Sequence, residues 1–220
     1  MKLRKLKTFL FGVHKTIIFN LKYFKFKDAI KFPVVVASNV ILADLKGEIE
    51  IKSPIKTGMI KIGFYETPFV YKQNIKSYWS LTGKIIFNGN ANLGKGSKIR
   101  CLGNISFGSN FNISSNTNIS CTKKIVFGDN TLIGYNCIFL DNDGHGIINE
   151  DGVFIKNEAE IISGNNVWYG EGCTVLKGSR IGNNTVIAAN SLLTNKYNYN
   201  NCIVGGHPAK FIKNIKGWKM

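Results

Sequence analysis

The chain of 220 residues carries a formal net charge of +16, with 44% hydrophobic and 19% charged residues. This composition excludes a disordered, charge-dominated polymer and allows one large domain with a buried core. The excess of lysine and arginine points to anionic partners, which are phosphates, nucleic acid or an acidic membrane surface.

The first 31 residues hold nine lysines and arginines against one acid, Asp28, so half of the net charge lies in this segment. The lysines alternate with leucine, phenylalanine, isoleucine and tyrosine. Such a basic amphipathic stretch favours two interpretations: a segment that lies on an anionic membrane surface, or a helix that covers the open end of the next domain. Nucleic acid binding is not expected, because no recognised motif accompanies the charge.

Two apolar stretches near the N-terminus are too interrupted or too short to cross a bilayer. "FLFGVHKTIIFNLKYF" contains His14, Lys15 and Lys22, and "FPVVVASNVILADL" is shorter than the roughly 20 apolar residues that a spanning helix needs. No small-residue cleavage site of a signal peptide follows. We therefore expect a soluble protein in the cytoplasm, or one held peripherally at the inner face of the membrane.

The five cysteines, at positions 101, 121, 137, 173 and 202, form no C-x-x-C pair. Neither a zinc site nor a disulfide framework is indicated. Reduced thiols that act as small buried residues fit a cytoplasmic location.

A period of six residues begins near residue 81. Hydrophobic residues recur six apart in runs that start at Phe87, Phe107 and Phe127, and again from Ser163 to Leu193. Three units of six close a triangular coil of about 18 residues, and stacked coils form a β-helix. Glycine and asparagine supply the tight corners.

This pattern predicts an all-β protein with three parts. Residues 1–80 form a basic N-terminal region with the first irregular strands, and residues 81–205 form the parallel β-helix. The period stops after Phe139 and resumes near Ile161, which predicts an inserted loop at about 140–161. Residues 206–220 are expected to form a C-terminal tail or short helix.

Three segments resemble the hexapeptide-repeat acyltransferases: "VFGDNTLIGYN", "VWYGEGCTVLKGSRIGNNTVIAANSLLT" and "IVGGHPAKFIKNI". Within that family the chain looks like the sugar O-acetyltransferases of bacterial surface-polysaccharide synthesis. The resemblance covers residues 81–215 and implies a left-handed β-helix that assembles as a homotrimer. It also implies that acetyl-CoA, the acyl donor, binds between neighbouring subunits, and that the acceptor is a saccharide or a lipid-linked glycan.

The resemblance assigns the general base to a histidine on a segment that interrupts the coil, and His145 in "DNDGHGI" matches it. A neutral imidazole can remove the proton of an acceptor hydroxyl near pH 7. Asp143 and Asp141 are candidates to orient the ring, because alternate residues of an extended segment share one side. The alternative is an ordinary surface turn that happens to contain all three.

The resemblance also assigns residues that border the donor. Trp168 is expected to point outward and to line the cleft, or else to pack between subunits. Ala188 and Ala189 match the small residues beside the pantetheine arm, although the family usually has glycine where Ala188 and Asn190 stand. The backbone of Gly170 and the next residue matches the donor to the oxyanion.

Lys210 and Lys213 are candidates for the CoA phosphates, or they belong to a solvated basic tail. No metal is expected, because His14, His145 and His207 lie far apart in the sequence. Two other functions stay open: N-acetyl transfer to an amino sugar, and a non-catalytic β-helix scaffold. A scaffold needs no break in the repeat, which favours the enzyme.

Overall fold

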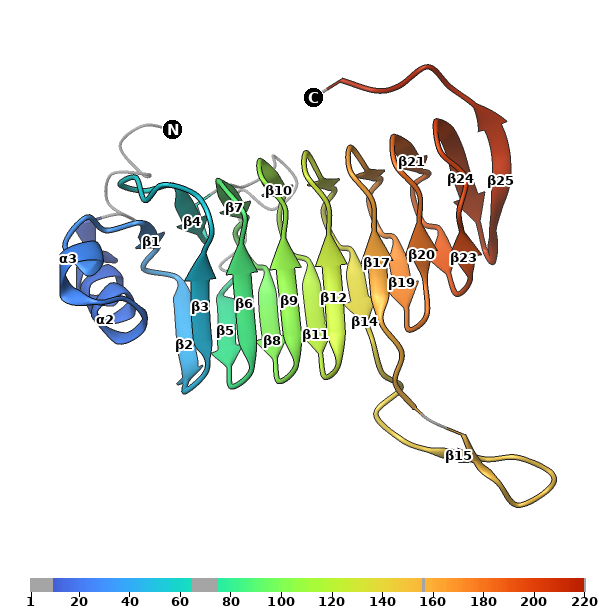
Figure 1. Ribbon diagram of the computed structural model, residues 1–220, viewed down its shortest axis with the longest axis horizontal. Coiled ribbons are helices and arrows are strands. Elements are labelled where there is room, and N and C mark those ends of the chain that lie inside the picture. Colours follow the sequence, from blue (N-terminus) through green and yellow to red (C-terminus); the bar gives the residue numbers. More distant parts are fainter. Residues whose placement is uncertain (1–9, 65–74, 156, 220) are drawn as a thin grey trace.

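Three parallel sheets wrap the chain into a three-sided prism (Figure 1). The computed structural model describes residues 10–64, 75–155 and 157–219. Consecutive strands alternate among the three sheets, so each full turn of the chain adds one strand to every sheet. The stack of these coils is a parallel β-helix, which confirms the predicted all-β class.

The strands of each sheet follow in spatial order. Sheet A contains β1 (Val34–Val36), β4 (Ile60–Ile62), β7 (Ala91–Leu93), β10 (Phe111–Ile113), β13 (Leu132–Ile133), β18 (Trp168–Tyr169), β21 (Thr185–Ile187), β24 (Cys202–Gly206) and β25 (Ala209–Asn214). Sheet B contains β2 (Val40–Leu45), β5 (Ser77–Leu81), β8 (Lys98–Cys101), β11 (Asn118–Cys121), β14 (Ile138–Leu140), β19 (Thr174–Leu176) and β22 (Leu192–Leu193). Sheet C contains β3 (Glu48–Ile51), β6 (Lys84–Phe87), β9 (Asn104–Phe107), β12 (Lys124–Phe127), β17 (Ile161–Ser163), β20 (Arg180–Ile181) and β23 (Lys196–Tyr197).

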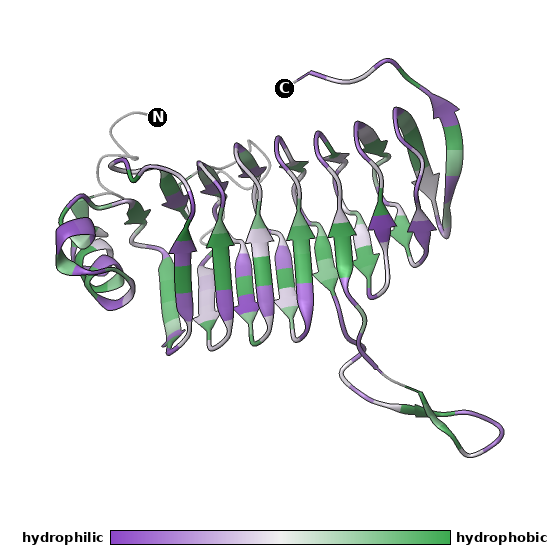
Figure 2. Cartoon of the chain, in the orientation of Figure 1, coloured by the Kyte–Doolittle hydropathy of each residue, from purple (hydrophilic) through white to green (hydrophobic). Residues whose placement is uncertain are grey.

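The inside of the prism is filled by the hydrophobic residues of the six-residue period. Alternate residues of a strand face opposite sides of the sheet, and in strands such as β8 and β11 hydrophobic and hydrophilic residues alternate (Figure 2). Phe87, Phe107 and Phe127 stack in one column, with neighbouring ring centroids 5.2 and 5.8 Å apart. Phe139 and Tyr169 extend this aromatic core, and all five side chains are buried.

The corner between sheets C and A is built from asparagines in the left-handed backbone conformation. Asn110, Asn130, Asn166, Asn184 and Asn201 have φ values between 53° and 57°, a region that asparagine enters more readily than other non-glycine residues. The side-chain amide of Asn166 donates to Asn184 at 2.6 Å, and that of Asn184 donates to Asn201 at 2.6 Å. This ladder is the physical reason why asparagine recurs in the repeat.

Two N-terminal helices, α2 (Val13–Tyr23) and α3 (Phe26–Ala29), lie at the open end of the prism. Of the two interpretations of the basic segment, the structure therefore shows the helix that covers this end (Figure 1). The stack itself starts at Val34, well before residue 81, because the first coils lack the six-residue spacing that marks the later ones. Lys2, Arg4, Lys5 and Lys7 of the basic segment lie outside the described residues.

The predicted C-terminal helix is wrong. Residues Ala209–Asn214 form β25, which runs antiparallel to β24. β24 is the last parallel strand of sheet A, and its free edge carries unpaired backbone groups that β25 satisfies. Within the described residues, no helix is long and apolar enough to span a membrane.

Candidate active site

A loop leaves the prism at the corner between sheets B and C. The chain departs after β14 and returns at β17, and in between it forms an antiparallel hairpin of β15 (Ile147–Ile148) and β16 (Phe154–Ile155). The hairpin projects away from the stack (Figure 1). Asp141, Asp143 and His145 all lie on its first arm.

Asp141 is fully buried and forms hydrogen bonds with the preceding coil of the chain. Its carboxylate accepts hydrogen bonds from the backbone N–H groups of Thr122, Lys123 and Lys124, each at 2.8 Å. The Thr122 hydroxyl donates to it as well, at 3.2 Å. This carboxylate is committed to the corner turn, so the prediction that Asp141 orients His145 is wrong.

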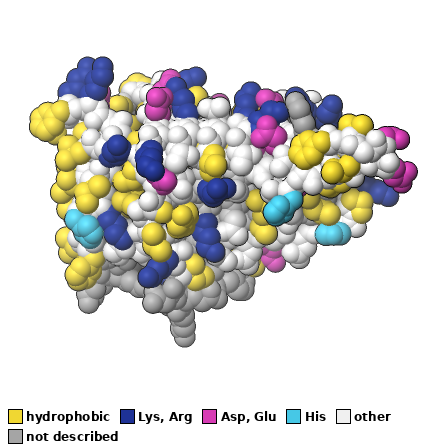
Figure 3. All heavy atoms as spheres, turned by 90° about the horizontal axis from the view of Figure 1, so that it is seen from below, with side chains coloured by type: hydrophobic (Ala, Val, Ile, Leu, Met, Phe, Trp, Pro, Cys, Tyr) yellow, Lys and Arg dark blue, Asp and Glu magenta, His cyan; other side chains and the backbone are white. Residues whose placement is uncertain are grey.

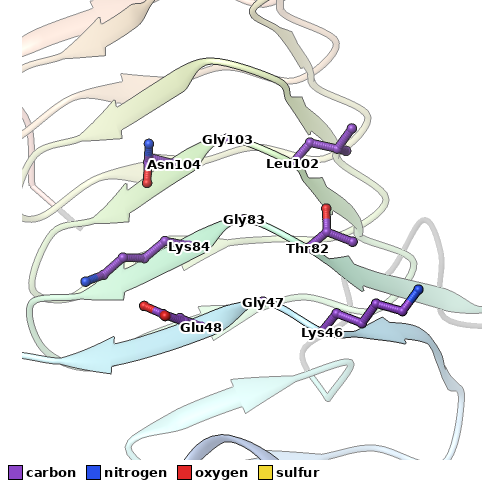
Figure 4. Close-up of a pocket in the computed structure, with 9 residues that line it drawn as sticks. All are labelled: Lys46, Gly47, Glu48, Thr82, Gly83, Lys84, Leu102, Gly103 and Asn104. Carbon is purple, nitrogen blue, oxygen red and sulfur yellow. The ribbon is translucent and has the colours of Figure 1, made fainter.

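The reason for this arrangement is visible one coil earlier. There the N–H groups of Leu102 and Gly103 donate to the carbonyl oxygen of Cys121 in the next coil, and Asn104 donates to Lys123. Figure 4 shows how these corners stack. Where the loop departs, the next coil has no such corner, and the two oxygens of Asp141 take the place of the missing carbonyls.

Glycine occupies the corner position in the first three of these turns, at Gly47, Gly83 and Gly103 (Figure 4). A Cβ atom at Gly83 would collide with the carbonyl oxygen of Gly103 in the next coil. Lys123 follows at the same position in the coil below the loop. A side chain is tolerated there because no further corner carbonyl lies over it.

Asp143 joins the loop to the coil that follows it in the chain. Its carboxylate forms an ion pair with Lys177, which follows β19, and its N–H donates to the carbonyl oxygen of Asn157 at 2.8 Å. Asn142 and Glu158 form an antiparallel bridge beside it. The two arms of the loop are therefore joined at its base.

His145 is exposed on the loop. Among the described residues, no group forms a hydrogen bond with its ring, and the carboxylate of Asp143 is held by Lys177 instead. The predicted contact between Asp143 and His145 is not formed within the single chain. The chain thus presents the imidazole to whatever approaches the hairpin.

The residues predicted to border the donor gather on sheet A. Tyr169 points into the core and Trp168 outward, with 40% of its surface exposed. Trp168 lies in register with Val186 of the next strand, which is in turn in register with Ile203. Ile203 pairs with Lys213 of β25, so one row across sheet A leads from the indole to this lysine.

A second row, of small residues, follows the corner where sheet A gives way to sheet B. A Cβ atom at Gly170 would lie 2.7 Å from the backbone nitrogen of Ala189. One at Gly205 would lie 2.6 Å from Cβ of Ala188, and Gly205 pairs with Lys210. Close stacking of the coils therefore accounts for the small size of Gly170, whereas Ala189 is exposed and its size is not fixed by packing.

The N–H of Gly170 donates to the carbonyl oxygen of Ile187 at 2.8 Å. It is therefore occupied, and the Glu171 N–H is the remaining candidate for an oxyanion donor at this corner. The Glu171 carboxylate accepts a hydrogen bond from the Tyr135 hydroxyl, which raises the pKa of Tyr135 above its ordinary value.

Two residues near these sites are not indicated by the sequence pattern. Trp218 of the C-terminal tail packs on Trp168, with ring centroids 5.9 Å apart, and its indole N–H donates to the carbonyl oxygen of Asn166 at 2.8 Å. Lys177 holds Asp143. Each contact joins a residue of the repeat to one outside it, Trp218 in the tail or Asp143 in the inserted loop, so no local signal predicts it.

The described chain offers no exposed thiol and no metal-binding cluster. All five cysteines are buried, and a hydrogen bond with Cys101 together with burial raises the pKa of the Cys121 thiol. A hydrogen bond with Cys137 lowers the pKa of the Cys173 thiol, but this residue is buried as well, so none of the five thiols is open to a substrate. Within the described residues, no group of three or more histidine, cysteine, aspartate or glutamate side chains is placed to hold a metal ion.

No protein-family model matches the chain. It is 43% identical over 53 residues to the "Putative lipopolysaccharide biosynthesis O-acetyl transferase WbbJ" of Escherichia coli (strain K12), a match that covers 24% of this chain and 26% of that protein. The alignment thus spans about a quarter of that relative's length.

Two solved structures align with the chain. The polySia-specific acetyltransferase NeuO aligns with a TM-score of 0.54 at 21% identity, over 83% of this chain and 89% of that chain. A hexapeptide-repeat-containing acetyltransferase, VCA0836 of Vibrio cholerae O1 biovar eltor, complexed with acetyl coenzyme A, aligns with a TM-score of 0.45 at 26% identity, over 51% of this chain and 61% of that chain. By its repeat and its left-handed parallel β-helix, the chain resembles the hexapeptide-repeat acetyltransferases.

Proposed function

We propose that the protein is a CoA-dependent acyltransferase that moves an acetyl group from acetyl-CoA to a hydroxyl of a saccharide in surface-polysaccharide synthesis. The observation that carries this proposal is the hairpin, which interrupts an otherwise continuous stack and presents the imidazole of His145. A scaffold gains nothing from such a loop. The local identity to a lipopolysaccharide O-acetyl transferase supports the class of acceptor.

The site is shared between subunits of a homotrimer. His145 leaves the prism at the corner between sheets B and C, whereas Trp168 and Ala189 lie on sheet A and on the corner between sheets A and B. These are different edges of one prism. A hairpin that reaches across to the sheet A face of a neighbour joins the two halves.

The proposed chemistry is a direct transfer. The neutral imidazole of His145 removes the proton of the acceptor hydroxyl while the hydroxyl oxygen attacks the thioester carbonyl carbon. The Glu171 N–H stabilises the oxyanion that forms. The C–S bond then breaks, the thiolate of CoA takes the proton from the imidazolium, and an acetyl ester and free CoA leave. No acyl-enzyme is formed, in keeping with the buried cysteines.

The donor lies along the small-residue row. Ala189 has no side chain beyond Cβ to obstruct the pantetheine arm, and the exposed ammonium groups of Lys210 and Lys213 are available to the CoA phosphates. Trp168 lines the same cleft. Reduced thiols and a thioester donor fit a cytoplasmic location.

The test measures release of free thiol from acetyl-CoA with a panel of sugars and amino sugars. His145→Ala lowers turnover by about 10²–10⁴-fold, the contribution of a general base, without changing the melting temperature. His207→Ala, at another exposed histidine, is the matched control and keeps wild-type turnover. Full turnover of His145→Ala would remove this residue from the mechanism, and thiol release with amino sugars alone would identify an N-acetyltransferase.

A further inference from the structure

Helix α2 turns its polar side chains toward the protein. The N–H of Val36 donates to the Thr16 hydroxyl at 2.9 Å. The Asn20 side chain donates to the carbonyl oxygen of Val34 at 2.7 Å and accepts from its N–H at 3.2 Å. These contacts satisfy the outer edge of β1, where the stack begins and where no further strand of the described residues pairs with it. Phe19 packs between them against Trp79.

The opposite face of the helix is exposed and carries mainly apolar side chains, with His14 as a polar residue among them. Ile17 is 40% exposed and Leu21 54% exposed, and their four-residue spacing places them on one side of the helix. The residues that share or adjoin this face are Leu10, Phe11, Val13 and Ile18, with Phe26 and Ile30 on the α3 segment. Figure 3 shows apolar side chains gathered at this end of the molecule, with lysines among them. We call this surface the helix face.

The helix face is accompanied by unpaired positive charge. Lys22, Lys25 and Lys27 are exposed, and among the described residues no carboxylate forms an ion pair with any of them. Asp28, the one acid in the segment, is paired with Lys31 at 2.9 Å. Apolar side chains with lysines beside them are complementary to a lipid surface, which has an apolar interior beneath a layer of anionic headgroups.

We propose that the helix face docks on an anionic membrane surface, with the apolar side chains of α2 among the lipid headgroups and acyl chains and the lysines on the phosphates. A second copy of the chain is the competing occupant. In a symmetric pair the same patch meets itself, so the two sets of lysines would face each other. Repulsion between lysines at short range opposes that pairing. An anionic membrane surface attracts the same lysines instead.

The experiment uses the full-length protein and flotation with vesicles. One set contains equal parts of phosphatidylglycerol and phosphatidylcholine, and the other contains phosphatidylcholine alone. Wild type is expected to float with the anionic vesicles, to remain free with the neutral ones, and to dissociate as salt is raised. Failure of the wild type to float with the anionic vesicles overturns the proposal.

Two variants locate the contact. Ile17→Ser/Leu21→Ser and Lys22→Glu/Lys25→Glu/Lys27→Glu are each expected to lower the partition coefficient about tenfold or more. Leu102→Ser/Ile212→Ser changes two aliphatic side chains that are also exposed but lie elsewhere, and it should bind as wild type does. Equal binding by all variants contradicts the proposal.

A third measurement distinguishes a membrane from a second copy of the chain as the partner of the helix face. If Ile17→Ser/Leu21→Ser lowers the mass of the protein in sedimentation without vesicles, the helix face joins copies of the chain and the membrane proposal fails. Melting temperature and acetyl transfer to a soluble sugar are expected to be the same in wild type and both helix variants. The docking result is thus independent of the proposed enzymatic activity.

Discussion

The two aspartates of the loop show how strongly a role depends on the immediate surroundings of a residue. Asp141 and Asp143 are two residues apart, yet one binds backbone N–H groups of the coil below and the other pairs with Lys177 of the coil above. The sequence placed both on one side of an extended segment with His145. The chain instead turns here, because the N–H of Gly144 donates to the Asn142 side chain at 2.7 Å and Gly144 has a φ of +78°.

Asp141→Ala leaves three partly buried N–H groups of the corner without an acceptor. We expect the free energy of unfolding to fall by about 2 to 3 kcal/mol, the cost of donors that lose a charged partner, as measured by urea denaturation. Asp151→Ala, in the exposed hairpin turn, is the control and should change stability by less than about 0.5 kcal/mol. A Asp141→Ala variant as stable as the control would show that water replaces the carboxylate.

At the scale of the elements, the hairpin of β15 and β16 stands apart from the rest of the fold. An isolated two-stranded hairpin is marginally stable in water. This one exposes Ile148 by 68% and Phe154 by 63%, together with Ile147, Val153 and Ile155. Contact with a neighbouring subunit would bury this surface, as the proposed trimer requires.

Ile148→Ser/Phe154→Ser is therefore expected to weaken assembly. In sedimentation experiments at decreasing protein concentration, the oligomer of this variant should dissociate at a protein concentration about tenfold or more above that for wild type. The reason is the loss of two large apolar contacts. Ile41→Ser, at a side chain that is 43% exposed on sheet B and lies on neither of the two proposed contact surfaces, should assemble normally. An unchanged mass for the hairpin variant would mean that its apolar side chains meet something other than a second copy.

The repeat made most of the elements predictable. A six-residue period dictates which side chains face inward, and residues such as Phe139, Val175 and Ile187 are indeed fully buried. The same period located the inserted loop. The period could not predict the coils before residue 81, because their spacing is irregular. It could not predict β25 either, because this strand carries no repeat and forms by pairing with the edge strand β24.

At the scale of the whole molecule, each end of the prism is closed by a different element. Helix α2 caps the edge of β1 with side chains, and β25 caps the edge of β24 with backbone. The long sides remain free for lateral contact. The resemblance already implied a donor bound between subunits. The order of the three sheets adds that His145 and the proposed donor residues lie on different edges of one prism.

The most direct test of the shared site is complementation between two inactive variants. His145→Ala lacks the base, and Ala189→Trp obstructs the donor face while its exposed position spares the core. Co-expressed in equal amounts, the two should form mixed oligomers in which about a quarter of the sites combine an intact hairpin with an intact neighbouring face, so about a quarter of wild-type turnover should return. Mixed oligomers that are as inactive as either parent would contradict a site built from two subunits.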